Sequence, residues 1–154
     1  LATFNSPHTD MSSPRTDIDA SWNAETLRAQ CKAFLDGTIA SKPYLCVASL
    51  STADGRAIAL ASARRDDDAN RIAAMASSLL ALSESFSRQI LRSPCKYSML
   101  ATEHGVIVTV RVPSAKRMHA LSIAADNSEM LALVLRHALD TAARLAGILD
   151  RSPL

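Results

Sequence analysis

Residues 72–87, IAAMASSLLALSESFS, contain one charged side chain, Glu84. The spacing of apolar residues predicts the middle of a long helix, and a helix with one side in water normally carries charged residues on that side. Here one side is small and neutral, with Ala74, Ser78, Ala81 and Ser85. The other side is an apolar stripe that a core would bury, made of Ile72, Met75, Ala76, Leu79, Phe86 and Ile90. We therefore expect both sides to be covered, the stripe by the protein's own sheet and the small side by a second subunit.

The segments before this helix predict one helix and one β-hairpin. Asn23 is placed to cap a helix that ends near Ser41, because Pro43 disfavours helical geometry in the residue before it. An apolar strand follows at residues 44–50 and a returning strand at 56–61, joined at Asp54-Gly55, a pair that tolerates the backbone of tight turns.

An acidic triplet, Asp66 to Asp68, leads into the central helix after Arg64-Arg65. Aspartate at a helix N-terminus accepts hydrogen bonds from free backbone N–H groups and complements the helix dipole. We interpret the triplet as a helix cap and not as a metal site.

The segments after the central helix predict a second hairpin, a fifth strand and a last helix. Strands are expected at residues 96–103, 106–112 and 119–124, with a turn at His104-Gly105, and the last helix is expected to start near Asn127-Ser128. Hairpins imply antiparallel pairing, so the order α-β-β-α-β-β-β-α predicts an α+β fold with one five-stranded antiparallel sheet.

The composition excludes several classes of protein. The chain has 154 residues, enough for one domain, and its formal charge of +2 and aromatic content of 4% do not favour nucleic-acid binding. No apolar run reaches the length of a membrane span, and no secretory signal is recognisable, so we expect a cytoplasmic protein without membrane insertion. Three widely spaced cysteines, Cys31, Cys46 and Cys95, are interpreted as small buried residues.

The expected organisation is a flexible tail at residues 1–20, one domain at residues 21–151 and a short end at residues 152–154. The tail is polar and offers little to bury. The natural start is left open between a position upstream of Leu1 and Met11.

Motifs for catalysis and cofactors are absent from the sequence. The four glycines are isolated, so no phosphate-binding loop is formed, and neither GxSxG nor HExxH occurs. The four histidines are spread over the tail, a turn, a strand start and a helix. We expect a non-enzymatic protein without catalytic residues, cofactor or metal.

The element order and three local patterns resemble the roadblock family of dynein light chains and their bacterial relatives. The patterns are the hairpin at residues 47–59 (VASLSTADGRAIA), the Ala/Ser/Leu-rich helix at 73–82 and the hairpin at 103–108 (EHGVIV). The resemblance covers about residues 22–150. Two places depart from the family pattern, the entry to the last helix at residues 126–130 (DNSEM) and the basic linker with Pro113 and Lys116-Arg117.

The resemblance implies a profilin-like sheet with the central helix on one face and the terminal helices on the other. It also implies a dimer in which the third strand pairs with its copy and the central helices pack together. The interface residues implied here are Arg71, Ala74, Met75, Ser78, Ala81, Leu82, Ser85, Tyr97, Ser98, Met99, Leu100 and Ala101.

Three functions stay open at this point. The resemblance implies a homodimer that regulates a small Ras-like GTPase, as a GTPase-activating protein or otherwise. Within this reading, Arg64 or Arg65 could act as an arginine finger, or pair with Asp66 or Asp67, or be solvated. The alternatives are an adaptor for another protein complex and a sensor of a small molecule, for which no polar cluster converging on a cavity is evident in the sequence.

Overall fold

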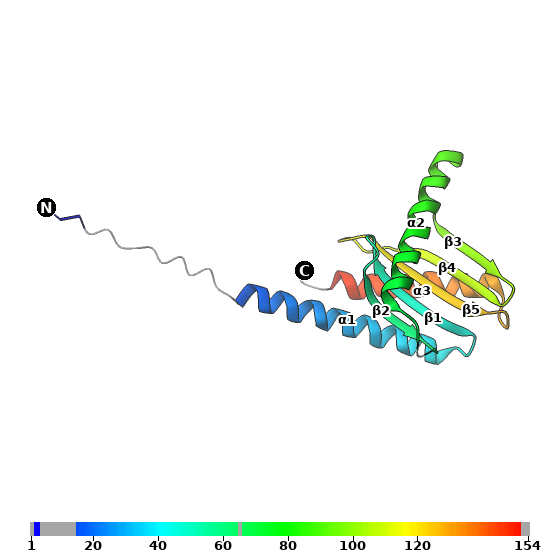
Figure 1. Ribbon diagram of the computed structural model, residues 1–154, viewed down its shortest axis with the longest axis horizontal. Helices are drawn as coiled ribbons and strands as arrows, with labels where there is room; N and C mark the ends of the chain where they lie inside the picture. The colour runs from blue at the N-terminus through cyan, green and yellow to red at the C-terminus, as the bar shows by residue number, and fades with distance from the viewer. Residues whose placement is uncertain (1, 4–14, 65, 152–154) are drawn as a thin grey trace.

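The computed structural model describes residues 2–3, 15–64 and 66–151. Side chains are described at residues 2–3, 23–64 and 66–151. The element order confirms the predicted α+β fold (Figure 1). The elements are α1 (Arg15–Ser41), β1 (Leu45–Thr52), β2 (Ala57–Ser62), α2 (Ala69–Leu91), β3 (Tyr97–Thr102), β4 (Gly105–Val112), β5 (His119–Asp126) and α3 (Leu131–Asp150).

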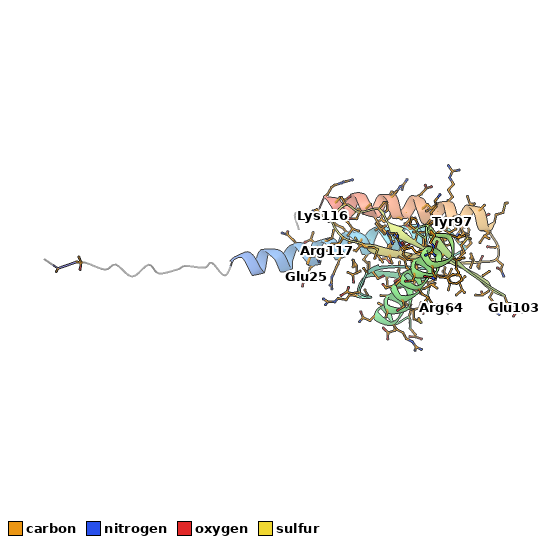
Figure 2. All side chains as sticks on the ribbon, turned by 90° about the horizontal axis from the view of Figure 1, so that it is seen from above. Glu25, Arg64, Tyr97, Glu103, Lys116 and Arg117 are labelled. Carbon is orange, nitrogen blue, oxygen red and sulfur yellow. The ribbon has the colours of Figure 1, made fainter. Side chains whose placement is uncertain are left out.

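The five strands form one antiparallel sheet in the order β2-β1-β5-β4-β3. Helices α1 and α3 pack on one face of this sheet and on each other, whereas α2 crosses the other face and packs only on strands among the described elements. Figure 2, seen from above, shows α2 and α3 on opposite sides of the strands. The layering is the one that the family resemblance implied.

The two faces of the sheet carry different side chains because successive residues of a strand point to opposite faces. The register aligns Leu50 of β1, Leu121 of β5 and Val110 of β4 in one row on the face that α1 and α3 cover. The neighbouring row, on the α2 face, holds hydroxyls: Ser49, Ser122, Thr109 and, on β3, Ser98. The largest cluster of buried apolar residues lies between the sheet, α1 and α3, and it contains no residue of α2.

Local signals fix the start of α2 and the two tight turns. The Asp68 carboxylate accepts hydrogen bonds from the backbone N–H groups of Asn70 and Arg71, at 3.1 and 3.2 Å, which confirms its capping role. Gly55 has φ +86°, the left-handed conformation that the β1–β2 turn requires. A Cβ at Gly105 would lie 2.1 Å from the carbonyl oxygen of Ala125, so only glycine fits where β4 meets β5.

The predicted start of the first helix was wrong. Helix α1 begins at Arg15, so Asn23 lies inside the helix and does not cap it, although the predicted end at Ser41 is confirmed. Residues 15–22 contain no Pro or Gly, and nothing in their sequence stops a helix. The helix therefore includes residues 15–20 of the predicted flexible tail, and the prediction for residues 4–14 lies outside the described residues.

Candidate interaction surface

The face of α2 that contacts the sheet is made of small residues and one leucine. Ala73, Ala76, Ser77 and Leu80 are buried there. The Ser77 hydroxyl donates to the Thr52 carbonyl oxygen at 2.8 Å and lies 3.1 Å from the Ser51 hydroxyl. Small side chains on the helix and on the strands allow close packing, and the serine hydroxyls satisfy each other there.

The prediction that the sheet of the same chain buries the large apolar stripe was therefore wrong. Of that stripe only Ala76 is buried, Ile72 and Leu79 are half-buried, and Met75, Phe86 and Ile90 are 57%, 68% and 62% exposed. The stripe lies beside the line of α2 that contacts the sheet. The physical reason is that α2 approaches the sheet through Ala73, Ala76 and Ser77, with the Ser77 hydroxyl bound to Ser51 and Thr52 of β1.

An exposed apolar surface results along α2 and β3, and we call it the α2–β3 face. Its large side chains are Met75, Leu82, Phe86, Ile90, Leu91, Tyr97 and Leu100, and all are exposed. Figure 1 shows the carboxyl-terminal half of α2 extending beyond β3, away from the sheet. Large contiguous apolar patches on proteins mark interaction sites.

Strand β3 is the edge of the sheet beside this helix. It pairs with β4 alone among the described strands, so its outer backbone groups are available to another strand. All twelve residues that the resemblance implied for a dimer interface are exposed or half-buried. They do not all point outward: Met99 packs against the core cluster.

Glu84, the one charged residue of the opening stretch, holds the end of α2 and the loop to β3 together. Its carboxylate accepts from the Cys95 backbone N–H at 2.7 Å and from Arg88 Nε at 2.6 Å, and lies 3.7 Å from Arg111 of β4. The hydrogen bond from Cys95, with the two arginines, lowers the pKa of Glu84. Sequence reasoning missed this role because the partners in the loop and in β4 are distant along the chain.

The arginines considered for phosphoryl chemistry lie at the connector between β2 and α2. Arg64 is exposed, and its guanidinium makes no ion pair with any described residue; Arg65 lies outside the described residues. Asp67 accepts a hydrogen bond from the Ser62 hydroxyl instead of pairing with Arg64. Figure 2 shows Arg64 on the α2 side of the molecule.

The remaining chemistry-bearing side chains are dispersed. Cys31 is buried and its burial raises the pKa of the thiol to about 11, whereas Cys46 and Cys95, predicted to be buried, are half-buried; all three are free thiols. Nδ1 of the buried His119 lies 3.0 Å from the Arg117 carbonyl oxygen. Within the described part of the chain, no group of three His, Cys, Asp or Glu side chains could hold a metal ion. No described helix is long and apolar enough to cross a membrane.

Comparison with known proteins defines the class. A model of the Roadblock/LC7 domain matches residues 33–115, more than half of the chain, so the chain belongs to the Roadblock/LC7 domain family. A search of curated proteins finds no significant match.

Several solved structures have the same fold. A Roadblock/LC7 domain from Streptomyces avermitilis superposes with a TM-score of 0.67 at 17% identity, covering 77% of this chain and 96% of that one. MglB of Myxococcus xanthus gives 0.68 at 17% identity, covering 79% and 95%. The gliding protein MglB of Thermus thermophilus gives 0.65 at 15% identity, covering 79% and 90%.

Proposed function

We propose that this protein is a non-enzymatic homodimer that binds a small Ras-like GTPase in the cytoplasm and regulates it or serves as its scaffold. The observation that carries the proposal is the α2–β3 face: an exposed apolar helix beside an unpaired strand edge. Membership of the Roadblock/LC7 family supports the GTPase as partner. Three free thiols agree with a reducing compartment.

Dimerisation through this face has a direct physical rationale. Pairing two copies of β3 would satisfy the backbone groups that the edge leaves open and would continue the sheet across both subunits. The same contact would bring Leu82 and Phe86 of each copy, 69% and 68% exposed, out of water. Each fully buried side chain of this size contributes about 2 kcal/mol. Ser78, small and uncharged, allows the two helices to approach closely.

Assembly beyond the dimer is left to experiment. One structural neighbour, at a TM-score of 0.68 and 16% identity, is described as MglB with a tetrameric arrangement. That description concerns MglB. For this chain, the apolar side chains that we expect to remain outside the dimer include two at the start of α3, Met130 at 73% and Leu131 at 49% exposure.

The direct test of the GTPase proposal uses a candidate GTPase encoded next to this chain's gene. Purified GTPase, loaded with GDP or with a non-hydrolysable GTP analogue, is titrated with this protein, and GTP hydrolysis is followed in parallel. We expect binding that depends on the nucleotide. Absence of binding in both nucleotide states would contradict the proposal.

Variants of the connector separate two ways of acting on hydrolysis. An arginine finger stabilises charge on the transferred phosphoryl group and is worth about 10³-fold or more in rate. If Arg64→Ala and Arg65→Ala both leave any stimulation unchanged, the protein acts by arranging the GTPase's own residues. Arg144→Ala, an exposed arginine on α3, is the matched control.

A further inference from the structure

The linker between β4 and β5, residues 113–118, is held in a fixed position by contacts at both of its ends. At its start, one carboxylate oxygen of Asp150 accepts hydrogen bonds from the Ser114 hydroxyl at 2.8 Å and from the Ala115 backbone N–H at 3.1 Å. Asp150 is the last residue of α3, where a negative charge is unfavourable to the helix dipole. Its hydrogen bonds to the linker offset this cost.

The end of the linker is held by its backbone. The Ala53 N–H, next to β1, donates to the carbonyl oxygen of Met118 at 3.2 Å. The carbonyl oxygen of Arg117 lies 3.0 Å from Nδ1 of the buried His119. The side chains of Arg117 and Met118 nevertheless remain exposed, that of Met118 by 43%. Because a loop that is already fixed loses little conformational entropy on binding, this linker is suited to recognition.

A pocket of about 210 Å³ lies between this linker and α2. Leu80 lines it from α2, Ala120 from β5, and Met118 from the linker. Its volume is below the range of about 300–1,000 Å³ that is typical of small-molecule sites. A pocket of this size is suited instead to one apolar side chain of another protein, which is a common arrangement at the centre of protein interfaces.

This pocket is separate from the α2–β3 face. Residues two apart on an α-helix lie about 200° apart around its axis, so Leu80 is on the opposite side of α2 from Leu82. None of the large side chains that define the α2–β3 face lines this pocket, and its described lining shares no residue with the larger cavities beside α2 and β3. A second subunit on the α2–β3 face therefore leaves the pocket open.

Two arginines lie at the pocket and the linker. Arg111 of β4 is in the pocket lining and its side chain is 41% exposed, whereas Arg117 is in the linker. The Arg117 guanidinium makes no ion pair with any described residue. Arg111 lies 3.7 Å from Glu84, whose carboxylate is also paired with Arg88.

The carboxylates around the pocket do not balance these arginines. Glu84 is shared between two arginines, and Asp54, in the turn next to the linker, pairs with Arg56 at 3.2 Å. Positive charge therefore predominates at the mouth of an apolar pocket. We call the linker at residues 113–118 together with this pocket the linker site. It fits an apolar side chain that has carboxylates beside it.

The start of α3 presents an exposed methionine among carboxylates. Met130, which precedes the helix, is 73% exposed, and Asp126 and Glu129 precede it in the same segment. Nδ2 of Asn127 donates to the carbonyl oxygen of Glu103 at 2.6 Å, which brings the β3–β4 turn beside this segment. None of the three carboxylates makes an ion pair with any described residue.

The linker site and the start of α3 lie at opposite ends of the sheet. Strand β5 begins at His119, directly after the linker, and ends at Asp126, so about 23 Å of extended strand separates them. Figure 2 shows Arg117 and Glu103 at opposite ends of the domain. One copy of the chain therefore cannot bring its own two surfaces together, but two copies can meet head to tail.

We propose that the linker site of one copy binds the start of α3 of another copy. Met130 fills the pocket, and the carboxylates around it lie beside Arg111 and Arg117. The contact joins two different surfaces, so its repetition links copies into rings or chains. It gives complementary roles to the two segments that depart from the family pattern, the basic linker and residues 126–130. It requires neither a GTPase nor the α2–β3 face.

Sedimentation velocity of the full chain at rising protein concentration tests this contact. In about 50 mM NaCl we expect species larger than the dimer, and their share increases with concentration. In about 500 mM NaCl the charges are screened, so we expect association at least tenfold weaker, with the dimer as the main species.

Variants on each surface locate the contact. Arg117→Glu and Glu129→Arg are each expected to abolish association beyond the dimer, because each places like charges together. Met130→Ser removes the apolar side chain from the pocket and weakens association about tenfold. Arg144→Glu, at an exposed position of α3, is the matched control and leaves association unchanged. If Glu129→Arg does not fold, Glu103→Arg, in the exposed β3–β4 turn, takes its place.

Mixing the two charge-reversed variants separates a head-to-tail contact from a symmetric one. The Arg117→Glu variant keeps its α3 start, and the Glu129→Arg variant keeps its linker site, so the mixture retains one native pair of surfaces. We expect the mixture to associate although neither variant does so alone. A symmetric contact uses the same surface on both copies and would not be restored in this way.

Several results would overturn the proposal. These are a parent chain without species beyond the dimer in low salt, unchanged association of both charge-reversed variants, and a mixture that does not associate. Variants that lose GTPase binding without losing association would assign the linker site to the GTPase, and would also overturn it. A parent chain that is monomeric in high salt but associates through these surfaces in low salt would contradict only the proposed dimer.

Discussion

The two faces of the sheet are formed by alternate residues of the same strands, but they are covered by helices to different extents. On the α1/α3 face, Leu50 and Leu121 are fully buried against helices that cover them completely. On the α2 face, the adjacent residues Ser49 and Ser122 lie under a single helix with a narrow contact line of small residues. The first face contains the core that stabilises the domain, and the second leaves apolar surface for other molecules.

The comparison shows why α2, although it carries few charged residues, leaves large apolar side chains exposed. Helix α3 buries Val134, Leu145 and Leu149. In contrast, α2 buries mainly alanine and serine and exposes Leu82 and Phe86. Apolar periodicity identifies a side that must be covered, but it does not identify which chain covers it.

The largest expected change in the free energy of unfolding comes from comparing a core leucine, Leu50, with an exposed leucine of α2, Leu82. Leu50→Ala creates a cavity in the core and lowers the free energy of unfolding by about 3 kcal/mol. Leu82→Ala, at 69% exposure, changes the unfolding of an isolated subunit by less than about 0.5 kcal/mol. Urea denaturation at several protein concentrations separates subunit stability from dimerisation. If both variants lost the same free energy of unfolding, the α2–β3 face would contribute to subunit stability as the core does, and the distinction would be wrong.

The second prediction sharpens the comparison within the hydroxyl row. Ser122→Ala removes the hydrogen-bond partner of buried Thr109 and lowers the free energy of unfolding by about 1–2 kcal/mol. Ser49→Ala removes a buried hydroxyl that has no hydrogen-bond partner among the described residues, and it leaves stability unchanged or higher. Thermal denaturation of the two variants measures both changes in stability. A destabilised Ser49→Ala variant would show that Ser49 has a structural partner.

The third prediction concerns the N-terminus of α2. Asp68→Ala removes the cap and costs about 1 kcal/mol of stability. Asp66→Ala, an exposed residue of the same triplet, is the control and is expected within about 0.5 kcal/mol of the parent. Equal effects of the two substitutions would show that general acidity, not capping, matters at this end.

The smallest effect is pH-dependent and concerns Glu84. Because the folded-state pKa of Glu84 is below the unfolded value, its ionised form stabilises the fold above the ordinary carboxyl pKa of about 4.3, and this contribution is lost as pH falls. Glu84→Gln should lower the melting temperature at pH 7, with the difference shrinking toward pH 3. Glu103→Gln, in the exposed β3–β4 turn, is the control. A difference that does not vary with pH would exclude the charge as the cause.

The sequence predicted the fold where local chemistry decides it. Asp54-Gly55, Asp68 and Pro43 each act within a few residues, so turns, the cap and a helix end could be placed correctly. The Val106–Val112 alternation also identified β4 as half of a hairpin, because strand period is a local property.

The orientation of α2 could not be predicted from its own residues. It depends on contacts such as those of Ser77 with Ser51 and Thr52 of β1, which are 25 or more residues away along the chain and come together only in the folded domain. The contacts of Glu84 with Cys95 and Arg111 have the same origin. The start of α1 was missed for a different reason: a good cap residue, Asn23, was given more weight than the absence of any helix-breaking residue before it.

The molar mass of the protein in solution tests the central claim most directly. This claim is that the α2–β3 face is the surface through which two copies assemble. Light scattering of the purified chain and of the Ser78→Arg variant is compared under the same conditions. We predict a dimer for the parent chain and a folded monomer for the variant, because two like charges would face each other in a desolvated contact. A monomeric parent chain, or a variant dimer as stable as the parent, would contradict the account.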